Sequence, residues 1–379
     1  MSWFEPWIAR AVADLASSRL LRDPKVVESV RGPFVTIGGR EVLSFCSNDY
    51  LGLSQHERLT SAVRAGSRWG AGSSRLMAGT TAAHRELERA IARFLGTESA
   101  LCFASGAAAN AGLLTSIADA GTLVLSDELN HASVVDACRL SKAQVKVYPH
   151  ADAEAAGKIL ASEAASRKLI FTDTVFSMDG DLAPLAALRK AADLHGAELI
   201  VDDAHGFGVL GQSGRGAVEL AGVEVAARTA NLSKAAGSIG GFVAGSADLV
   251  RLMESKARSY IYTTASPPAV AEAGQAAVGL VREAHAARRR ALALADRLAR
   301  GIRSLGYAVR ESPAPFLPVV LGSEERALEV AGDLWEKGFL VPAIRPPTVP
   351  KGTCRLRISV TALHNEEHVD ALVSALPKR

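Results

Sequence analysis

The lysine at position 234 is the most distinctive chemistry-bearing residue of this 379-residue chain. It follows Asn231, Leu232 and Ser233 and precedes the glycine-rich run AAGSIGGF. A lone lysine is ordinarily exposed to solvent and needs no crowding by small residues. A lysine that forms a Schiff base requires the close approach of a planar cofactor and partial removal of water. The segment therefore indicates a candidate nucleophilic amine, with an exposed lysine as the alternative.

A second candidate pair follows the apolar run AELIVDD, in which Asp202 falls at the expected end of a strand and His205 comes three residues later. A buried carboxylate at that place could hold a protonated ring nitrogen. The nearby imidazole could bind a phenolic or carbonyl oxygen. The same two residues would also fit an aspartate that caps a turn and a histidine that packs beside it, so both interpretations stay open.

An anion site is indicated after the run ALCF, where the small-residue turn of Ser105, Gly106 and Ala107 leads into an expected helix. Free N–H groups and the positive end of the helix dipole would point at the strand's end, which suits a phosphate. An ordinary strand-to-helix turn is the alternative. The turn is not GxGxxG, so a dinucleotide is not indicated.

Two further segments fit a ring-shaped ligand. His131 follows TLVLSD, where its imidazole could stack on a ring, and Ser177 follows KLIFTD, where it offers a hydroxyl. Taken singly, both are compatible with ordinary polar loop residues. The order phosphate turn, strand-end Asp202, then Lys234 along one sheet supports a pyridoxal-phosphate site.

Short apolar runs that alternate with helical stretches must position these residues. The expected strands are 100–103, 122–127, 145–148, 168–173, 197–203 and 241–246. This alternation predicts an α/β domain with a mainly parallel sheet, whose ligands sit outside the carboxyl ends of the strands.

We expect three regions. Residues 1–45 would form an N-terminal helix (3–21) and a hairpin in VTIGGREVLSF, and 46–280 the large α/β domain. Residues 281–379 would form a smaller α+β domain with strands in FLPVVL and CRLRISV, preceded by one or two long helices over 268–305.

Composition narrows the class of protein. Hydrophobic residues make up 48% and charged residues 22%, and 43 basic against 40 acidic residues give a net charge of +3. These values are typical of globular proteins and do not indicate a nucleic-acid binder. Four scattered cysteines without a CxxC pair indicate reduced thiols and a cytoplasmic location. We expect neither a signal peptide nor a membrane span.

Two minor patterns have simpler explanations. The segment from His364 to His368 fits H-x-x-E-H, which zinc hydrolases use, but no third ligand segment follows it. We expect a capped surface helix there and no metal site. The basic run Arg288 to Arg290 is interpreted as a solvated helix face.

Over residues 44–363 the chain closely resembles the α-oxoamine synthases, which are pyridoxal-phosphate enzymes of the aspartate-aminotransferase fold (fold type I). The segments that carry the resemblance, in the family's order, are SNDYLGL, SGAAAN, HASVVDA, FSMDGDLAPL, VDDAHGFGVLG, LSKAAGSIGG, IYTTASPP and IRPPTVPKGTCRLR. The resemblance implies a large domain with a mainly parallel sheet and a smaller C-terminal α+β domain.

The resemblance also implies roles for individual residues. Lys234 would be the Schiff-base lysine, Asp202 the partner of the ring nitrogen, and His131 the histidine stacked on the ring. The remaining implied contacts are His205 and Ser177 near the phenolic oxygen, Gly106, Ala107, Asn231 and a partner subunit's Thr264 near the phosphate, and Arg22, Asn48, His131, Thr348 and Arg357 near the substrate.

Some of these assignments stay open. Arg19 competes with Arg22 as the N-terminal substrate contact. Asn231 stands where the family usually has threonine and Ala107 where it often has an aromatic residue, so the phosphate contact of Asn231 is uncertain from the sequence. The group that protonates the product is also undecided, with His131 favoured.

Within the family, VDDAHG and AIRPPTVP favour the branch that condenses L-alanine with a pimeloyl thioester in biotin biosynthesis, with loss of CO2 and of the carrier thiol. The carrier could be CoA or an acyl-carrier protein. The alternative is a relative that uses another amino acid or acyl thioester. A non-catalytic protein of the same fold is disfavoured by the retained lysine, aspartate and histidines. The expected assembly is a homodimer with shared active sites, without nucleic acid or membrane.

Overall fold

The computed structural model describes residues 2–66, 68–309 and 313–379. The chain divides into two compact units. The large unit consists of Asn48–Leu292 and Ser312–Ala314, and the small unit consists of Met1–Ser47, Ala293–Glu311 and Pro315–Arg379. The N-terminal segment thus belongs to the same unit as the C-terminal part of the chain.

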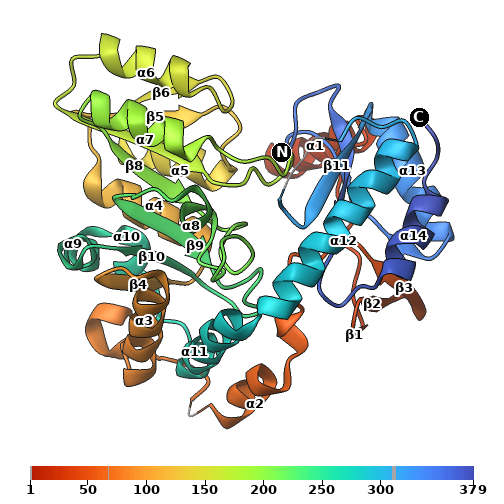
Figure 1. Cartoon of the computed structure of the whole chain (residues 1–379), viewed down its shortest axis with the longest axis horizontal. Coiled ribbons are helices and arrows are strands. Elements are labelled where there is room, and N and C mark those ends of the chain that lie inside the picture. Colours follow the sequence, from red (N-terminus) through yellow and green to blue (C-terminus); the bar gives the residue numbers. More distant parts are fainter. Residues whose placement is uncertain (1, 67, 310–312) are drawn as a thin grey trace. The chain divides into compact units, whose positions relative to one another are not determined.

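A seven-stranded sheet forms the centre of the large unit, in the order β4-β10-β9-β8-β7-β5-β6 (Figure 1). Its strands are β4 (Ser99–Phe103), β5 (Thr122–Asp127), β6 (Gln144–Tyr148), β7 (Arg167–Asp173), β8 (Glu198–Asp202), β9 (Ala227–Asn231) and β10 (Gly241–Gly245). All six predicted strands are present. Only β10 runs antiparallel, to both β4 and β9. The expected mainly parallel α/β sheet is confirmed.

Helices cover both faces of this sheet (Figure 1). The helical segments of the large unit are η1 (Leu53–Gln55), α2 (Glu57–Ala65), η2 (Arg75–Gly79), α3 (Ala82–Leu95), α4 (Gly106–Ile117), α5 (Ala132–Ser141), α6 (Ala153–Ser162), α7 (Leu185–Leu194), α8 (Ala217–Ala221), α9 (Ala247–Lys256), α10 (Arg258–Ile261) and α11 (Pro268–Glu283). Alternate strand residues such as Leu101, Val124 and Val243 form one core with α4, α5, α9 and α10. The inner strands are buried because both faces are covered, whereas four of the five residues of the edge strand β6 are exposed.

Strand β9 is absent from the sequence-based prediction because ARTAN carries three polar residues. Each of its residues is nevertheless buried. Thr229 donates from Oγ1 to Asn110 Oδ1 over 2.6 Å, and Arg228 lies 3.6 Å from the Asp203 carboxylate. Partners of this kind remove most of the cost of burying a polar strand, and nothing in the local sequence reveals them.

The small unit is an α+β structure with two sheets. Its elements are α1 (Phe4–Ser17), β1 (Ser29–Arg31), β2 (Phe34–Ile37), β3 (Arg40–Ser44), β11 (Phe316–Gly322), α13 (Glu324–Glu336), β12 (Phe339–Leu340), β13 (Ala343–Ile344), β14 (Cys354–Ser359) and α14 (Glu366–Ala375). The sheet orders are β1-β2-β3-β12 and β11-β14-β13. Strands β2 and β3 form the predicted antiparallel hairpin.

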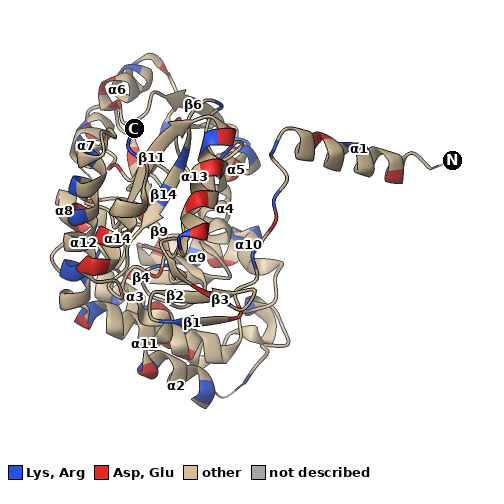
Figure 2. Ribbon diagram, turned by 90° about the vertical axis from the view of Figure 1, so that its right-hand side faces the viewer, with Lys and Arg blue, Asp and Glu red and all other residues tan. Residues whose placement is uncertain are grey.

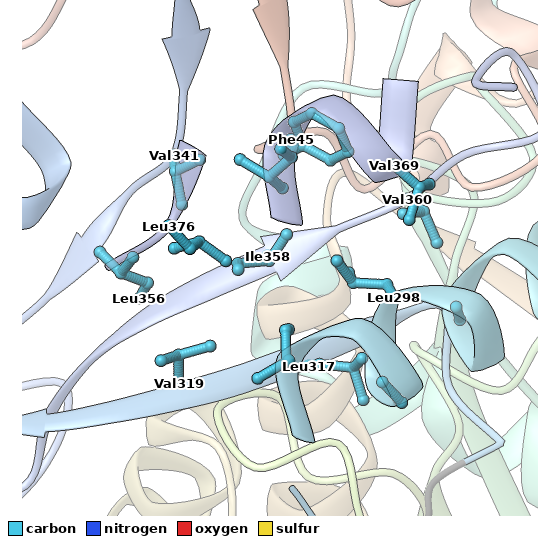
Figure 3. Close-up of a cluster of buried hydrophobic side chains, with 14 of the residues drawn as sticks. Phe45, Leu298, Leu317, Val319, Val341, Leu356, Ile358, Val360, Val369 and Leu376 are labelled. Carbon is cyan, nitrogen blue, oxygen red and sulfur yellow. The ribbon is translucent and has the colours of Figure 1, made fainter. Parts of the chain in front are cut away.

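The core of the small unit lies between the second of these sheets and its helices (Figure 3). Leu298 from α12 (His285–Ser304) packs with Leu317, Ile358 and Val369 in this cluster. The helical stretch predicted over 268–305 is two helices, α11 and α12, which meet at Ala284. Helix α1 contributes no buried residue, although Trp3 and Trp7 lie on its apolar stripe.

The H-x-x-E-H segment has hydrogen bonds that explain its histidines. His364 accepts at Nδ1 from the N–H of Thr361 over 3.1 Å and meets the Ser44 carbonyl with Nε2, also over 3.1 Å. Burial lowers the pKa of His364 to about 4. His368 accepts from the N–H of Asn365 in a capping box at the start of α14. The His364 imidazole therefore stabilises the turn before α14 and its contact with Ser44, and the His368 imidazole stabilises the start of α14.

Basic and acidic residues are interspersed along the helices (Figure 2). The interpretation of Arg288 to Arg290 as a solvated face is wrong for Arg288, which is 4% exposed, while Arg289 and Arg290 are exposed. Within the described residues, no helix combines the length and the apolar character needed to span a bilayer.

Candidate functional site

One pocket lies at the carboxyl ends of the central strands of the large unit. It is lined by Gly106, Ala107, His131, Ser133, Asp173, Val175, Asp202, Ala204, His205, Asn231 and Lys234. These residues follow β4, β5, β7, β8 and β9, so five separate strand ends supply them. The pocket brings together seven of the predicted site residues, including the lysine, the aspartate and both histidines.

The turn after β4 presents an anion site. Ser105 caps helix α4 by accepting the Ala108 N–H at its Oγ over 3.1 Å. The N–H groups of Gly106 and Ala107 donate to no acceptor in the part of the chain that the structure describes. Two backbone donors at the positive end of a twelve-residue helix suit a phosphate.

The close approach of β10 to this turn depends on Gly241. A Cβ atom at that position would lie 2.4 Å from the Ser105 carbonyl oxygen and 2.5 Å from the Gly106 nitrogen. No side chain fits there without displacing the turn. The turn is therefore held directly against the neighbouring strand.

Asn231 completes the same corner of the pocket. A Cβ atom added to Gly106 would lie 3.5 Å from Nδ2 of Asn231, so the amide faces the turn. Its Oδ1 is buried without a hydrogen-bond partner. Because the two ends of an amide exchange by a simple flip, either end can meet a ligand there. An orphaned amide beside free N–H groups fits a phosphate that is bound with the cofactor.

The carboxylate of Asp202 is held firmly at the end of β8. Its Oδ2 accepts from Asn110 Nδ2 over 2.7 Å, and its Oδ1 accepts from the Ala204 N–H over 2.9 Å. Asn110 is fully buried and in turn accepts from Thr229 at Oδ1. Sequence reasoning missed Asn110, although an asparagine on the inward face of an otherwise apolar helix is a detectable signal.

His131 is oriented by the same network. Its Nδ1 accepts from the Ser133 N–H over 3.2 Å and lies 2.7 Å from Ser133 Oγ, which accepts from Asn110 Nδ2. Since Nδ1 is an acceptor, the neutral ring carries its proton on Nε2. Burial lowers the pKa of His131, and the charge of Lys234 lowers it further, against the opposite influence of Asp202. The ring is therefore a neutral donor at Nε2.

Asp173 is a second carboxyl in the pocket that sequence reasoning missed. It stands opposite Asp202 on the adjacent strand, and its Oδ2 accepts from the His131 N–H over 3.0 Å. Its Oδ1 is buried without a partner. Burial, reinforced by the charge of Asp202, raises the pKa of Asp173 well above its ordinary value. The surroundings of Asp173 therefore favour its neutral form.

His205 is joined to Asn48 through a tyrosine. The hydroxyl of Tyr50 donates to Asn48 Oδ1 over 3.0 Å and lies 2.8 Å from His205 Nδ1. These two contacts of the hydroxyl fix the position of the His205 ring beside Asn48. Tyr50 is fully buried and was not singled out in the sequence.

Ser177 lies in a turn beside the pocket and is not among the described residues that line it. The turn closes through the Phe176 N–H to the Asp181 carbonyl, over 3.0 Å. His150 holds this turn in place, because its Nδ1 lies 3.0 Å from Asp127 Oδ1 and its Nε2 lies 2.8 Å from Asp181 Oδ2. These two bonds and the two negative charges outweigh burial and raise the pKa of His150 to about 10. The imidazolium thus links β5 to the Ser177 turn.

Thr264 does not line this pocket of its own chain, as far as the described residues extend. It is exposed, and its backbone forms a bridge with Ser74 beside η2. A small separate cavity there is bordered by Thr263, Thr264 and Arg75. Arg75 is buried and paired with Glu88 at 2.8 Å, which anchors the segment.

The predicted substrate residues Arg22, Thr348 and Arg357 belong to the small unit. Arg22 donates to the Pro346 carbonyl over 2.9 Å, whereas Arg19 forms an ion pair with Glu325 at 2.6 Å. The Thr348 N–H binds the Arg345 carbonyl. The guanidinium of Arg357 lies over the Phe316 ring at 3.9 Å. Arg22 and Thr348 therefore meet on the same short segment, 345–348.

The pocket of the large unit fits pyridoxal phosphate in its chemistry. It offers free N–H donors for a phosphate, a fixed carboxylate for a ring nitrogen, and a primary amine for an aldehyde. It also offers two imidazoles, that of His131, which is a donor at Nε2, and that of His205, whose Nδ1 lies 2.8 Å from the Tyr50 hydroxyl.

Comparison with known proteins agrees with this chemistry. The aminotransferase class I and II family matches residues 40–376. An 8-amino-7-oxononanoate synthase from Methylococcus capsulatus is 46% identical over 98% of this chain and 97% of its own.

Among solved structures, the serine palmitoyltransferase of Sphingomonas wittichii superposes with a TM-score of 0.91 and 31% identity, over 99% of this chain and 96% of that one. A structure of SPT with PLP also gives a TM-score of 0.91, with 30% identity over 98% and 96% of the two chains. The expected fold, cofactor and enzyme class are thereby confirmed. The chain belongs to the aminotransferase class I and II family and, within it, to the pyridoxal-phosphate-dependent α-oxoamine synthases.

Proposed function

We propose that this protein condenses L-alanine with a pimeloyl thioester, with loss of CO2 and of the carrier thiol, to give 8-amino-7-oxononanoate for biotin synthesis. The similarity to synthases of that name over nearly the whole chain supports this choice within the family. The observation that carries the chemistry is one pocket lined by Lys234, Asp202 and His131. Asn110, behind the lining, binds Asp202 directly and is linked to His131 through Ser133.

When bound, pyridoxal phosphate supplies an electrophilic carbon for the substrate amine and a ring that accepts the electrons released at Cα. The residues assigned to hold it are Gly106 and Ala107 through their N–H groups and Asn231 through its amide. Lys234 supplies the amine that holds the cofactor covalently. The same amine, in the same pocket, is the base assigned to the Cα proton of alanine.

Asp202 keeps a proton on the ring nitrogen. Its two fixed hydrogen bonds leave the carboxylate no freedom to turn away, and its negative charge favours the protonated ring. His131 stands ready as proton donor, because its Nε2 carries the proton and its orientation is set by Ser133. His205, held by Tyr50, is assigned to the phenolic oxygen beside the ring, together with Ser177.

We further propose that the enzyme is a homodimer with shared active sites. Large apolar side chains are exposed on η2 and on the segments next to it and to Thr264, namely Trp69 (70%), Leu76 (50%), Met77 (82%) and Tyr262 (70%). The η2 segment is joined to the 264–266 segment by the Ala265 N–H to the Ser73 carbonyl, over 2.9 Å. Exposed apolar patches of this kind mark interaction surfaces. A second copy on this surface would bring Thr264 to the partner's phosphate.

The acyl donor and the amino acid are tested together. The purified enzyme with pyridoxal phosphate is supplied with L-alanine, glycine or L-serine, each with pimeloyl-CoA, pimeloyl-acyl-carrier protein or palmitoyl-CoA. Thiol release and the ketone product are measured. The proposal requires kcat/KM to be highest for L-alanine with a pimeloyl donor. A preference for L-serine with palmitoyl-CoA would contradict it. The four free thiols fit our proposal of a cytoplasmic enzyme.

A further inference from the structure

A second cavity of about 520 Å³ lies elsewhere on the large unit. It is lined by Ala90, Arg93, Phe94, Ser213, Arg215, Gln275, Val278, Gly279, Arg282 and His285. These residues come from α3, the loop before α8, α11 and the first turn of α12. None of them lines the pocket that fits pyridoxal phosphate.

The lining is strongly cationic. Arg93, Arg215 and Arg282 contribute three guanidinium groups, His285 adds an imidazole, and no acidic residue belongs to the lining. Across residues 2–66, 68–309 and 313–379, none of these three guanidinium groups forms an ion pair. Three like charges around one cavity repel one another unless an anion joins them.

His285, which lines the cavity, is held in one tautomer by Arg288. Its Nδ1 lies 2.9 Å from Nη2 of Arg288, and a guanidinium can only donate. Nδ1 is therefore the acceptor, and the ring's proton is on Nε2. Arg288 also donates from Nη1 to the Val281 carbonyl over 2.6 Å, which fixes the guanidinium itself.

Arg288 is a buried charge without a carboxylate partner among the described residues, and it is 4% exposed. Glu219 is the acidic group whose charge acts on it, but that carboxylate accepts the N–H groups of Ser213 and Arg215. The loop closes over the guanidinium at Gly214, where a Cβ would lie 2.5 Å from Nη1. Burying a cation in this way is costly unless negative charge lies close by.

We propose that this cavity binds a small anion that carries two or more phosphate groups. Three arginines match several negatively charged oxygens, and each planar guanidinium can bind a phosphate through two parallel bonds. Phe94 and Val278 are buried and give the cavity an apolar floor. The site is independent of the proposed condensation reaction, so either can fail without the other.

The test uses inorganic pyrophosphate as the probe, titrated by calorimetry into the enzyme loaded with pyridoxal phosphate, at constant ionic strength. The pocket variant is Arg93→Gln with Arg282→Gln, and the matched control is Arg251→Gln with Arg10→Gln, which removes two exposed arginines outside the cavity lining. The pocket variant should bind pyrophosphate about tenfold or more weakly, because charge-assisted bonds are lost, while the control keeps the wild-type affinity.

Orthophosphate should bind the wild type several-fold more weakly than pyrophosphate does. Equal affinities for the two anions would overturn the assignment to a ligand with several phosphates. Absence of pyrophosphate binding to the wild type would overturn the site itself. An equal loss in the pocket and control variants would also overturn it, because such a loss reports only net charge. An unchanged melting temperature and bound-cofactor absorbance verify that the pocket variant is folded.

Discussion

Replacing His150 by glutamine should remove a stabilising charge whose effect depends on pH. The imidazolium lies between Asp127 and Asp181, 3.0 and 2.8 Å from their oxygens, and its side chain is only 14% exposed. Glutamine keeps a polar group at the site but cannot carry the positive charge. The two carboxylates would then face each other without a cation between them.

The size of the effect follows from the pKa of His150, which is raised from 6.5 to about 10. A difference of about 3.5 units corresponds to about 4–5 kcal/mol as an upper limit, at 1.36 kcal/mol per unit. We expect about 2–4 kcal/mol, because holding Asp127 and Asp181 close together costs part of the gain. A raised pKa means that this stabilisation is complete below pH 6.5 and is lost as the pH rises through 10.

The assay is the difference in urea midpoint between wild type and His150→Gln at about pH 6, 8 and 10, with saturating pyridoxal phosphate. Groups common to both proteins cancel in this difference. Asp203, with a pKa of about 6, titrates at the lower edge of the window, and His364, with a pKa of about 4, titrates below it. The difference in urea midpoint should be largest at about pH 6 and should become smaller toward about pH 10. A gap that stays constant, or that widens with pH, would refute the reasoning.

Three predictions concern the site directly. Lys234→Ala should leave no turnover above background, measured as thiol release, because no other amine lines the pocket within the described residues; multiple turnovers near the wild-type rate would exclude the assignment. Asp202→Asn should lower kcat by about a hundredfold or more, the usual scale for one preorganised electrostatic group. Cofactor stoichiometry should be unchanged, and a near-normal kcat would mean that the charge is not required. Thr264→Val should weaken pyridoxal-phosphate binding to the apoenzyme by about 1–3 kcal/mol, the cost of one bond to a charged group. Thr263→Val is the matched control; equal dissociation constants for wild type and Thr264→Val would contradict a shared site.

The fold was largely predictable from the sequence because six of the seven strands of the large sheet contain short apolar runs bounded by polar or turn residues. The residues after such strands had to converge on one edge, which is why Lys234, Asp202 and His131 could be grouped before the structure was known. The antiparallel direction of β10 was not predictable. Its pairing with β4 and the close approach at Gly241 join segments far apart in the sequence.

The supporting residues of the site were harder to find. Asn110 and Tyr50 act through other side chains, and Asp173 binds the backbone N–H of His131. Each of the three has an ordinary explanation when read alone. Their importance appears only when Asn110 is found between Asp202 and Ser133. Arg288 was misassigned for the related reason that burial of one arginine in a basic run leaves no trace in local composition.

The position of β10 also constrains how the chain can be assembled during its synthesis. In the described structure β4 pairs only with β10, which is translated much later, after β5 to β9. Until β10 leaves the ribosome, β4 stays an unpaired edge and the 105–107 turn lacks its neighbouring strand. The nascent protein therefore cannot bind its cofactor step by step as successive segments are synthesised. Cofactor capture waits for one late strand, and the incomplete sheet is the species that molecular chaperones must shield.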